Sequence, residues 1–311
     1  MGSESYNEGR QFTLVVGSDS LIGKALMAHL NRAGSRVLGT TRRYEQVDDI
    51  HLYLDLAKNV NDWQCPFPVK VAVVCAGVTN LDMCRHNPIA SASTNVEGLS
   101  ALVKNLVNSG AFVIYLSTNQ VFDGTVPYRK TDDPLSPITE YGRQKAEAEL
   151  RISAFADSVA IVRLTKVLGP NHMLFSAWAG AMQKGEAIQP FADMVIAPIP
   201  LSCVVSVIRL LADRRLSGIF HVSGERDISY AEAAFLGAEL LGADSCLIQP
   251  VNASQSGHYT EVVPAHTTLN IDSLRFALGI EPPDVRWTVK MAYMKPSTLV
   301  GIDKMLFYTR F

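Results

Sequence analysis

Two side chains that can move a proton stand one helical turn apart in the segment Tyr141-Gly142-Arg143-Gln144-Lys145. Positions i and i+4 of a helix share one face, so the phenol and the ammonium would point the same way. A phenol titrates near pH 10 and needs a neighbouring cation to donate and recover a proton near neutrality. Lys145 could supply that cation. The pair predicts acid–base chemistry by Tyr141, with a surface Tyr and Lys as the alternative.

A hydroxyl group follows the predicted strand that precedes this helix. The strand, Ala111–Ser117, closes with Leu116-Ser117, and Thr118 follows directly. Ligands of an open parallel sheet lie outside the carboxyl ends of its strands, so Thr118 and Tyr141 could converge on one substrate oxygen. Thr118 would then donate a hydrogen bond while Tyr141 transfers the proton. The alternative is that Thr118 only caps a turn.

A glycine turn lies between the first predicted strand, Phe12–Val16, and the first predicted helix, Leu21–Ala33. At such a turn a dinucleotide pyrophosphate meets free N–H groups and the positive end of a helix. Ser20 stands at the middle position, where close approach to phosphate usually selects glycine, and a plain strand-to-helix turn is the alternative. The residues expected to contact a cofactor here are Gly17, Ser20, Leu21, Ile22 and Gly23.

Two arginines follow the second predicted strand, Arg36–Thr40. An NAD site usually presents an acidic residue here to the ribose 2′-hydroxyl, whereas this chain has Thr41-Arg42-Arg43. Guanidinium groups suit a 2′-phosphate through bidentate, charge-assisted hydrogen bonds. The pair favours NADPH, with NADH as the other cofactor to consider, and a solvated loop is the alternative reading of Arg42 and Arg43.

Apolar strands alternate with helical patterns through the first half of the chain. This alternation predicts an α/β fold with a parallel sheet built from right-handed βαβ units. The rhythm changes after Gly169-Pro170. We therefore expect a cofactor domain over 1–170, a smaller α+β substrate domain over 171–295 interleaved with the first, and a tail over 296–311. Further strands are predicted over Leu52–Leu56, Val69–Cys75, Val159–Leu164 and Ile219–Val222, and helices over Ser91–Val107, Leu174–Lys184, Val204–Ala212 and Tyr230–Leu241, with another from about Tyr141.

The motifs occur together in an order that resembles the extended short-chain dehydrogenase/reductases, and within them the dTDP-4-dehydrorhamnose reductase subfamily. The likeness runs from about residue 12 to residue 290. It is carried by Gly17-x5-Gly23, Asp55-Leu56, Cys75-Ala76-Gly77, Thr94-Asn95-Val96-x-Gly98, the segment Ser117 to Gly124, Tyr141-Gly142-x-x-Lys145-x-x-x-Glu149 and His221-Val222-Ser223-Gly224.

The resemblance implies an α/β fold of the Rossmann type, a doubly wound parallel sheet with a smaller α+β C-terminal substrate domain. It also implies roles for individual residues. Thr118, Tyr141 and Lys145 would be the catalytic triad, and Asn95 would complete a proton relay. Asp55 would lie by the adenine amino group. Leu56, Cys75, Ala76, Gly77 and Lys145 would line the cofactor. The substrate would be the 4-keto group of a nucleotide-linked 6-deoxy sugar.

The chain departs from the subfamily where the resemblance places the substrate. Asn119-Gln120 replaces Asp-Tyr, and Lys166 replaces a Trp that helps to hold the sugar. Lys166 could meet a phosphate or a carboxylate instead. The substrate-binding residues expected on this basis are Asn119, Gln120, Val121, Phe122 and Lys166.

Composition bounds the remaining possibilities. The 311 residues are 48% hydrophobic and 19% charged with a net charge of −2, which excludes disorder and offers no basic footprint for nucleic acid. Apolar runs are too short to span a bilayer, and we see no secretory signal. Five widely spaced cysteines fit reduced thiols in a cytoplasmic protein, and we expect no metal site.

These observations predict an NAD(P)H-dependent oxidoreductase that reduces a keto group on a nucleotide sugar or a similar polar carbonyl compound. Two alternatives stay open: a sugar-nucleotide epimerase that recycles the hydride, and a non-catalytic NADP-binding regulatory subunit. The expected partner is a small-molecule substrate, and a homodimer is compatible with the sequence.

Overall fold

The computed structural model describes residues 11–253 and 263–295, and they form two compact units. Unit 1 contains the described residues up to Phe122 together with Pro134–Arg163 and Val205–Phe220. Unit 2 contains Asp123–Asp133, Leu164–Val204 and the described residues from His221 onward. The chain therefore passes between the units several times, and the sequence predicts domains over 1–170 and 171–295, the second interleaved with the first.

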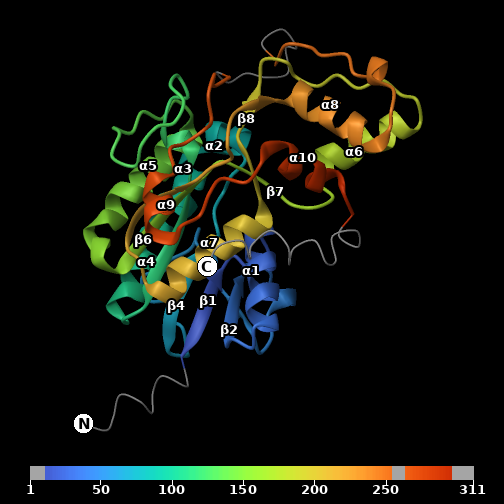
Figure 1. Ribbon diagram of the computed structural model, residues 1–311. Helices are drawn as coiled ribbons and strands as arrows, with labels where there is room; N and C mark the ends of the chain where they lie inside the picture. Colours follow the sequence, from blue (N-terminus) through green and yellow to red (C-terminus); the bar gives the residue numbers. More distant parts are fainter. Residues whose placement is uncertain (1–10, 254–262, 296–311) are drawn as a thin grey trace. The chain divides into compact units, whose positions relative to one another are not determined.

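The core of unit 1 is a sheet with strand order β10-β6-β5-β4-β1-β2-β3 (Figure 1). The pairs β1–β2, β2–β3, β1–β4 and β4–β5 are parallel. From β3 to β6 this is the Rossmann order, which confirms the predicted fold class. The strands are β1 (Phe12–Val16), β2 (Val37–Thr41), β3 (His51–Tyr53), β4 (Val69–Val74), β5 (Phe112–Thr118), β6 (Val159–Leu164) and β10 (Gly218–Val222).

Helices cover both faces of this sheet. On one face, apolar side chains of α4 (Leu99–Asn108) and α5 (Glu140–Ile152) join the strand residues in one buried cluster. On the other face, α1 (Leu21–Arg32) lies beside α7 (Leu201–Arg214) (Figure 1). The charges of Arg209 and Asp213 on α7 reach His29 on α1, where burial lowers the imidazole pKa most, Arg209 lowers it further and Asp213 raises it. Burial on both sides explains why the central strands read as continuous apolar runs.

A predicted strand and a predicted helix of unit 1 differ from the observed elements by more than a shift of their ends. The strand expected over Leu52–Leu56 ends at Tyr53, because the Asp55 carboxylate accepts from Ala57 N at 3.0 Å and turns the chain out of the sheet. The helix expected over Ser91–Val107 is three segments: α3 (Pro88–Ala92), a π-helical turn (Ser93–Gly98) and α4. The sequence also missed α2 (Leu81–His86).

Unit 2 is organised around a second apolar cluster, in which Phe175 stacks on Tyr293 with ring centres 4.9 Å apart. Its strands pair as β7 with β9 (parallel) and β8 with β11 (antiparallel). Its elements are β7 (Lys166–Leu168), α6 (Met173–Gln183), β8 (Val195–Ile196), β9 (Pro198–Pro200), β11 (Ile228–Ser229), α8 (Tyr230–Leu241), α9 (Asp272–Leu278) and α10 (Val285–Tyr293). The predicted tail over 296–311 lies outside the described residues, as does the segment 254–262.

Candidate functional site

The turn after β1 is hydrogen-bonded to β2 and packs against the end of β4. Gly17 has a φ of +79° and donates its N–H to Thr40 Oγ1 at 3.1 Å. A Cβ on Gly17 would come within 2.8 Å of the Ala76 nitrogen. Only glycine satisfies both the positive φ and this close approach. The turn thus lies between β1 and β4, where the strand order reverses and open α/β sheets bind ligands.

Ser20 caps α1. The sequence comparison, which treated Ser20 only as a replacement for the usual middle glycine, did not predict this role. Its side chain accepts from Gly23 N at 3.0 Å, which satisfies one of the four N–H groups that have no partner at a helix start. Leu21 and Ile22 occupy the first helical positions, where backbone N–H groups have no intrahelical acceptor. A Cβ on Gly23 would collide with the Gly17 carbonyl, so the helix start packs directly on the turn. The start of α1 is therefore able to receive an anion.

The residues expected along the rest of the cofactor differ in exposure. Arg42 and Arg43 are exposed just after β2. Asp55 is half-buried and occupied in its own turn. Leu56 is only 5% exposed and belongs to the core, where its backbone leaves no room for a Cβ on Gly98. The structure thus gives Leu56 a packing role.

The segment after β4 is held by Asn95 from the π-helical turn. Asn95 Oδ1 accepts from Val78 N at 2.8 Å, and its Nδ2 donates to Val78 O at 2.9 Å. Gly77 lies against the same amide. Cys75 is half-buried, and burial raises the pKa of its thiol to about 12, so it remains a neutral thiol. Asn95 therefore fixes the backbone beside the glycine turn.

The hydroxyl groups of Thr118 and Tyr141 meet at the carboxyl end of β5. Both residues are nearly buried, at 7% and 8% exposure, and their side chains are hydrogen-bonded. Burial raises the pKa of Tyr141 above its ordinary value, and the bond with Thr118 opposes that rise. Thr139 caps α5 by accepting from Gly142 N at 3.0 Å, which fixes the helix start that carries the phenol. The two hydroxyls therefore adjoin, and Thr118 Oγ1 also accepts from Gln120 N at 3.2 Å, which is the turn cap that the sequence left as the alternative.

Lys145 is a buried cation in the same corner. Its Nζ donates to Leu116 O at 2.7 Å and lies 4.3 Å from the centre of the Tyr115 ring. Burial lowers the pKa of Lys145 to about 8, while the negative charge of Glu149 opposes that fall. The ammonium therefore stays mostly protonated at pH 7. Its hydrogen bond and its ring contact are both with β5, and the structure gives no direct bond to Tyr141 or to Asn95 among the described residues.

A buried ion pair that was not predicted from the sequence lies beneath this corner. Arg163 on β6 binds Glu149 on α5, with Nη2 and Oε2 at 2.8 Å and both side chains at most 4% exposed. Ser117 donates to the same carboxylate. The spacing Tyr141, Lys145, Glu149 was a usable signal, because three residues four apart share one helix face.

The residues after Thr118 divide into an accessible pair and a buried pair. Asn119 and Gln120 are partly exposed, and Gln120 Oε1 accepts from Thr139 Oγ1 at 3.1 Å. Val121 is fully buried, and Phe122, 4% exposed, lies under the Arg163 guanidinium. Val121 and Phe122 thus support the turn from inside, which does not fit the substrate contact expected of their side chains.

Lys166 begins β7 in unit 2. The residue is exposed, yet its ammonium is sufficiently surrounded by protein that burial lowers its pKa. Among the described residues it makes no ion pair. His172 lies close enough for Lys166 to help lower the pKa of the imidazole, after burial. This part of unit 2 therefore carries an uncompensated positive charge.

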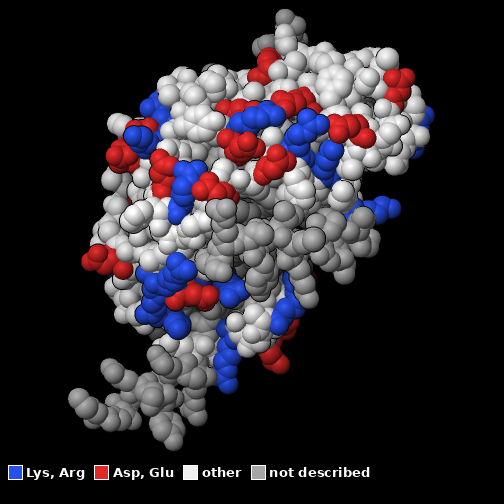
Figure 2. Space-filling model, viewed as in Figure 1, with Lys and Arg blue, Asp and Glu red and all other residues white. Residues whose placement is uncertain are grey.

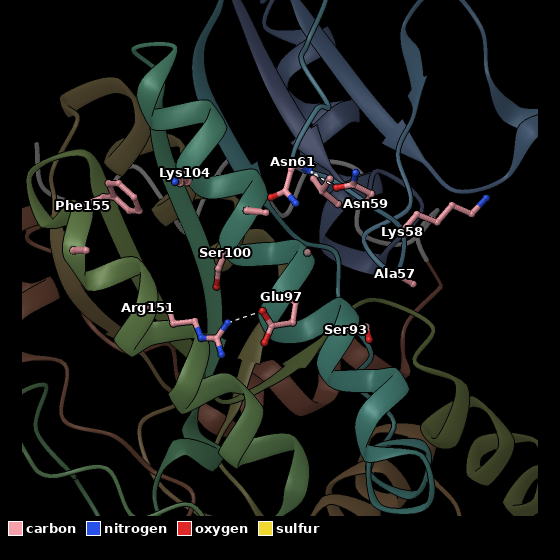
Figure 3. A pocket seen from close by; sticks show the side chains of 14 residues that line it. Ala57, Lys58, Asn59, Asn61, Ser93, Glu97, Ser100, Lys104, Arg151 and Phe155 are labelled. Atoms are coloured by element: carbon pink, nitrogen blue, oxygen red, sulfur yellow. Dashed lines mark hydrogen bonds and ion pairs between the residues drawn. The ribbon is translucent and has the colours of Figure 1, made fainter.

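A pocket of about 550 Å³ lies elsewhere in unit 1 (Figure 3). Helix α4 and the loop before β4 contribute Lys104, Ser100 and Asn61, and Arg151 of α5 crosses to Glu97 at 2.7 Å. None of the predicted catalytic or cofactor residues lines it. This pocket is therefore separate from the glycine turn and from the corner of Thr118, Tyr141 and Lys145.

The described residues contain no group of three or more His, Cys, Asp or Glu side chains that could hold a metal ion. In the same ranges no helix has the length and apolarity needed to cross a membrane. The face drawn in Figure 2 carries Lys and Arg side by side with Asp and Glu.

The chain can now be compared with known proteins. The family described as "RmlD substrate binding domain" matches residues 11–297. The chain belongs to this family. The match spans most of both units and confirms the extended short-chain dehydrogenase/reductase assignment, with its dTDP-4-dehydrorhamnose reductase branch.

Proteins similar to this chain include reductases and a subunit of a methionine adenosyltransferase. A probable low-salt glycan biosynthesis reductase of Haloferax volcanii is 25% identical, covering 88% of this chain and 94% of the relative. The bovine methionine adenosyltransferase 2 subunit beta is 28% identical, covering 81% and 78%. A Bacillus anthracis dTDP-4-dehydrorhamnose reductase solved with NADP has a TM-score of 0.79 at 19% identity, covering 90% and 96%.

Proposed function

We propose that the protein is an NAD(P)H-dependent reductase of a keto group on a nucleotide-linked sugar or a similar polar carbonyl compound. The observation that carries the proposal is the buried corner where the Thr118 and Tyr141 hydroxyls adjoin, with the Lys145 ammonium bound to the same strand. This corner ends β5 in the same unit as the glycine turn. Arg42, Arg43 and the start of α1 fit the phosphates of a dinucleotide.

The side chains divide the work of carbonyl reduction. Thr118 donates a hydrogen bond to the substrate oxygen, and Tyr141 transfers a proton to that oxygen as negative charge develops on it. The Lys145 ammonium favours the phenolate that remains. A bound nicotinamide would supply the hydride. Lys166 suits a phosphate or a carboxylate of the substrate, and we propose that unit 2 carries the substrate-recognition residues.

The similarity to methionine adenosyltransferase 2 subunit beta favours a second candidate, a nucleotide-binding subunit that regulates another enzyme. This function would need the glycine turn but not the proton-transferring corner. The retention of Thr118, Tyr141 and Lys145 in one buried corner supports the reductase over this candidate.

One experiment separates the candidates. The purified chain is incubated with NADPH and a panel of nucleotide 4-keto sugars, and loss of nicotinamide absorbance is followed. Turnover that requires Tyr141 supports the reductase. Tight NADPH binding without turnover on any carbonyl compound contradicts it and supports the regulatory subunit. Cofactor that co-purifies and undergoes no net oxidation would support the epimerase.

A further inference from the structure

The glycine turn carries an acidic side chain that reaches the end of β2. Asp19 Oδ2 accepts from Thr41 Oγ1 at 2.7 Å, and the same hydroxyl accepts from Arg43 N at 3.1 Å. Ser18 N donates to Thr40 O at 3.0 Å, which holds the turn against the strand. The carboxylate therefore lies at the strand end where Rossmann proteins read the ribose of their cofactor.

Gln46 joins this carboxylate to one of the two arginines. With its amide nitrogen towards the turn, Gln46 donates to Asp19 Oδ1 at 2.8 Å and accepts from Arg43 Nη1 at 3.2 Å. Asp19 and Arg43 are thus neighbours without a direct ion pair. A carboxylate offers about four lone-pair sites, so Asp19 can accept further hydrogen bonds while it holds Thr41 and Gln46.

We propose that Asp19 determines cofactor selectivity by accepting a hydrogen bond from the ribose 2′-hydroxyl of NADH. It thereby offsets the preference of Arg42 and Arg43 for the 2′-phosphate of NADPH. This inference rests on the proposed nucleotide-dependent function. Rossmann proteins that bind NAD usually supply the acid from the second strand, whereas here it comes from the glycine turn. A 2′-phosphate would meet both a repelling carboxylate and an attracting guanidinium, so the site accepts both nucleotides.

The test measures binding rather than turnover. NADPH and NADH are titrated by nicotinamide fluorescence, and adenosine 2′,5′-bisphosphate and 5′-AMP are compared by thermal shift. Wild-type protein should bind the two dinucleotides within about tenfold of each other. Asp19→Asn keeps an acceptor for Thr41 and removes the charge. It should raise the NADPH-to-NADH affinity ratio about tenfold, an effect that salt should reduce because the repulsion is screened.

Two variants serve as controls. Glu45→Gln removes a negative charge from the same exposed loop and should leave the ratio unchanged, since Glu45 forms no hydrogen bond or ion pair with Asp19 or Arg43 in this described part of the chain. Arg43→Gln should shift the ratio in the opposite direction. If Asp19→Asn unfolds, Asp19→Ser makes the same comparison.

The outcomes distinguish a failure of the role of Asp19 from a failure of the proposed function. A ratio that stays within twofold of wild type in Asp19→Asn overturns the role of Asp19 while the reductase proposal stands. An equal shift in Glu45→Gln also overturns it, because general charge would then explain the effect. If wild-type protein binds neither dinucleotide, the proposed function and this inference both fail.

Discussion

The two ends of the candidate site in unit 1 are built in opposite ways. At the proposed catalytic corner, which consists of Thr118, Tyr141 and Lys145, no residue is more than 8% exposed. At the nucleotide end, Arg42 and Arg43 are exposed and Asp19 is half-buried. Buried charges and hydrogen bonds act in a low effective dielectric, whereas exposed ones are screened by water and salt. Substitutions at the corner should therefore abolish activity or destabilise the fold. Substitutions at the nucleotide end should only change the preference between NADPH and NADH.

The largest expected effect is on the proton donor. Tyr141→Phe should lower kcat by about 10²–10⁴-fold, the usual contribution of a positioned acid–base group, with little change in NADPH affinity. Tyr115→Phe is a matched control, since Tyr115 is another buried tyrosine of this corner and its hydroxyl has no hydrogen-bond partner in the described part of the chain. Steady-state kinetics on a turned-over substrate checks both. Equal losses of kcat in the two variants would contradict a role for Tyr141 as the proton donor.

The buried ion pair should dominate stability. Glu149→Gln leaves the Arg163 guanidinium buried without a counter-charge and should cost about 3–5 kcal/mol in the free energy of unfolding. Arg151→Ala breaks exposed pairs with Glu97 and Glu147 and should cost less than about 1 kcal/mol each. Urea unfolding measures both. Similar costs would show that burial does not separate these two kinds of pair.

The pH dependence should come from the corner as well. The Lys145 pKa of about 8 lies below the 10.5 of an ordinary lysine, so the ammonium is present below pH 8 and lost above it. We expect kcat/KM to fall as pH rises through 8, approaching tenfold per pH unit. Tyr115→Phe keeps the ring beside Nζ and should leave this limb in place. A flat profile from pH 7 to 10 would contradict a requirement for the charged lysine.

The sequence predicts regular elements better than close approaches between distant residues. β1 and α8 have the predicted bounds, since continuous apolar runs and helical periodicity reflect local burial. The meeting of Thr118 and Tyr141 follows from strand-end topology, a rule that needs no coordinates. The Asn95 contact with Val78 and the Arg163 pair with Glu149 could not be derived, because they depend on how separate helices and strands pack.

Ser20 gives the smallest expected effect and the sharpest test of the nucleotide end. Ser20→Gly restores the usual middle glycine and should cost only a few tenths of a kcal/mol, whereas Ser20→Ala should cost about 1 kcal/mol through loss of the cap on Gly23 N. If the serine hydroxyl only caps α1, dinucleotide affinity should rise slightly or stay constant in the glycine variant. Calorimetric titration beside thermal unfolding separates the two effects. If Ser20→Gly lowered dinucleotide affinity without lowering stability, the serine hydroxyl itself would bind a phosphate of the dinucleotide. The nucleotide end would then bind its ligand as specifically as the buried corner.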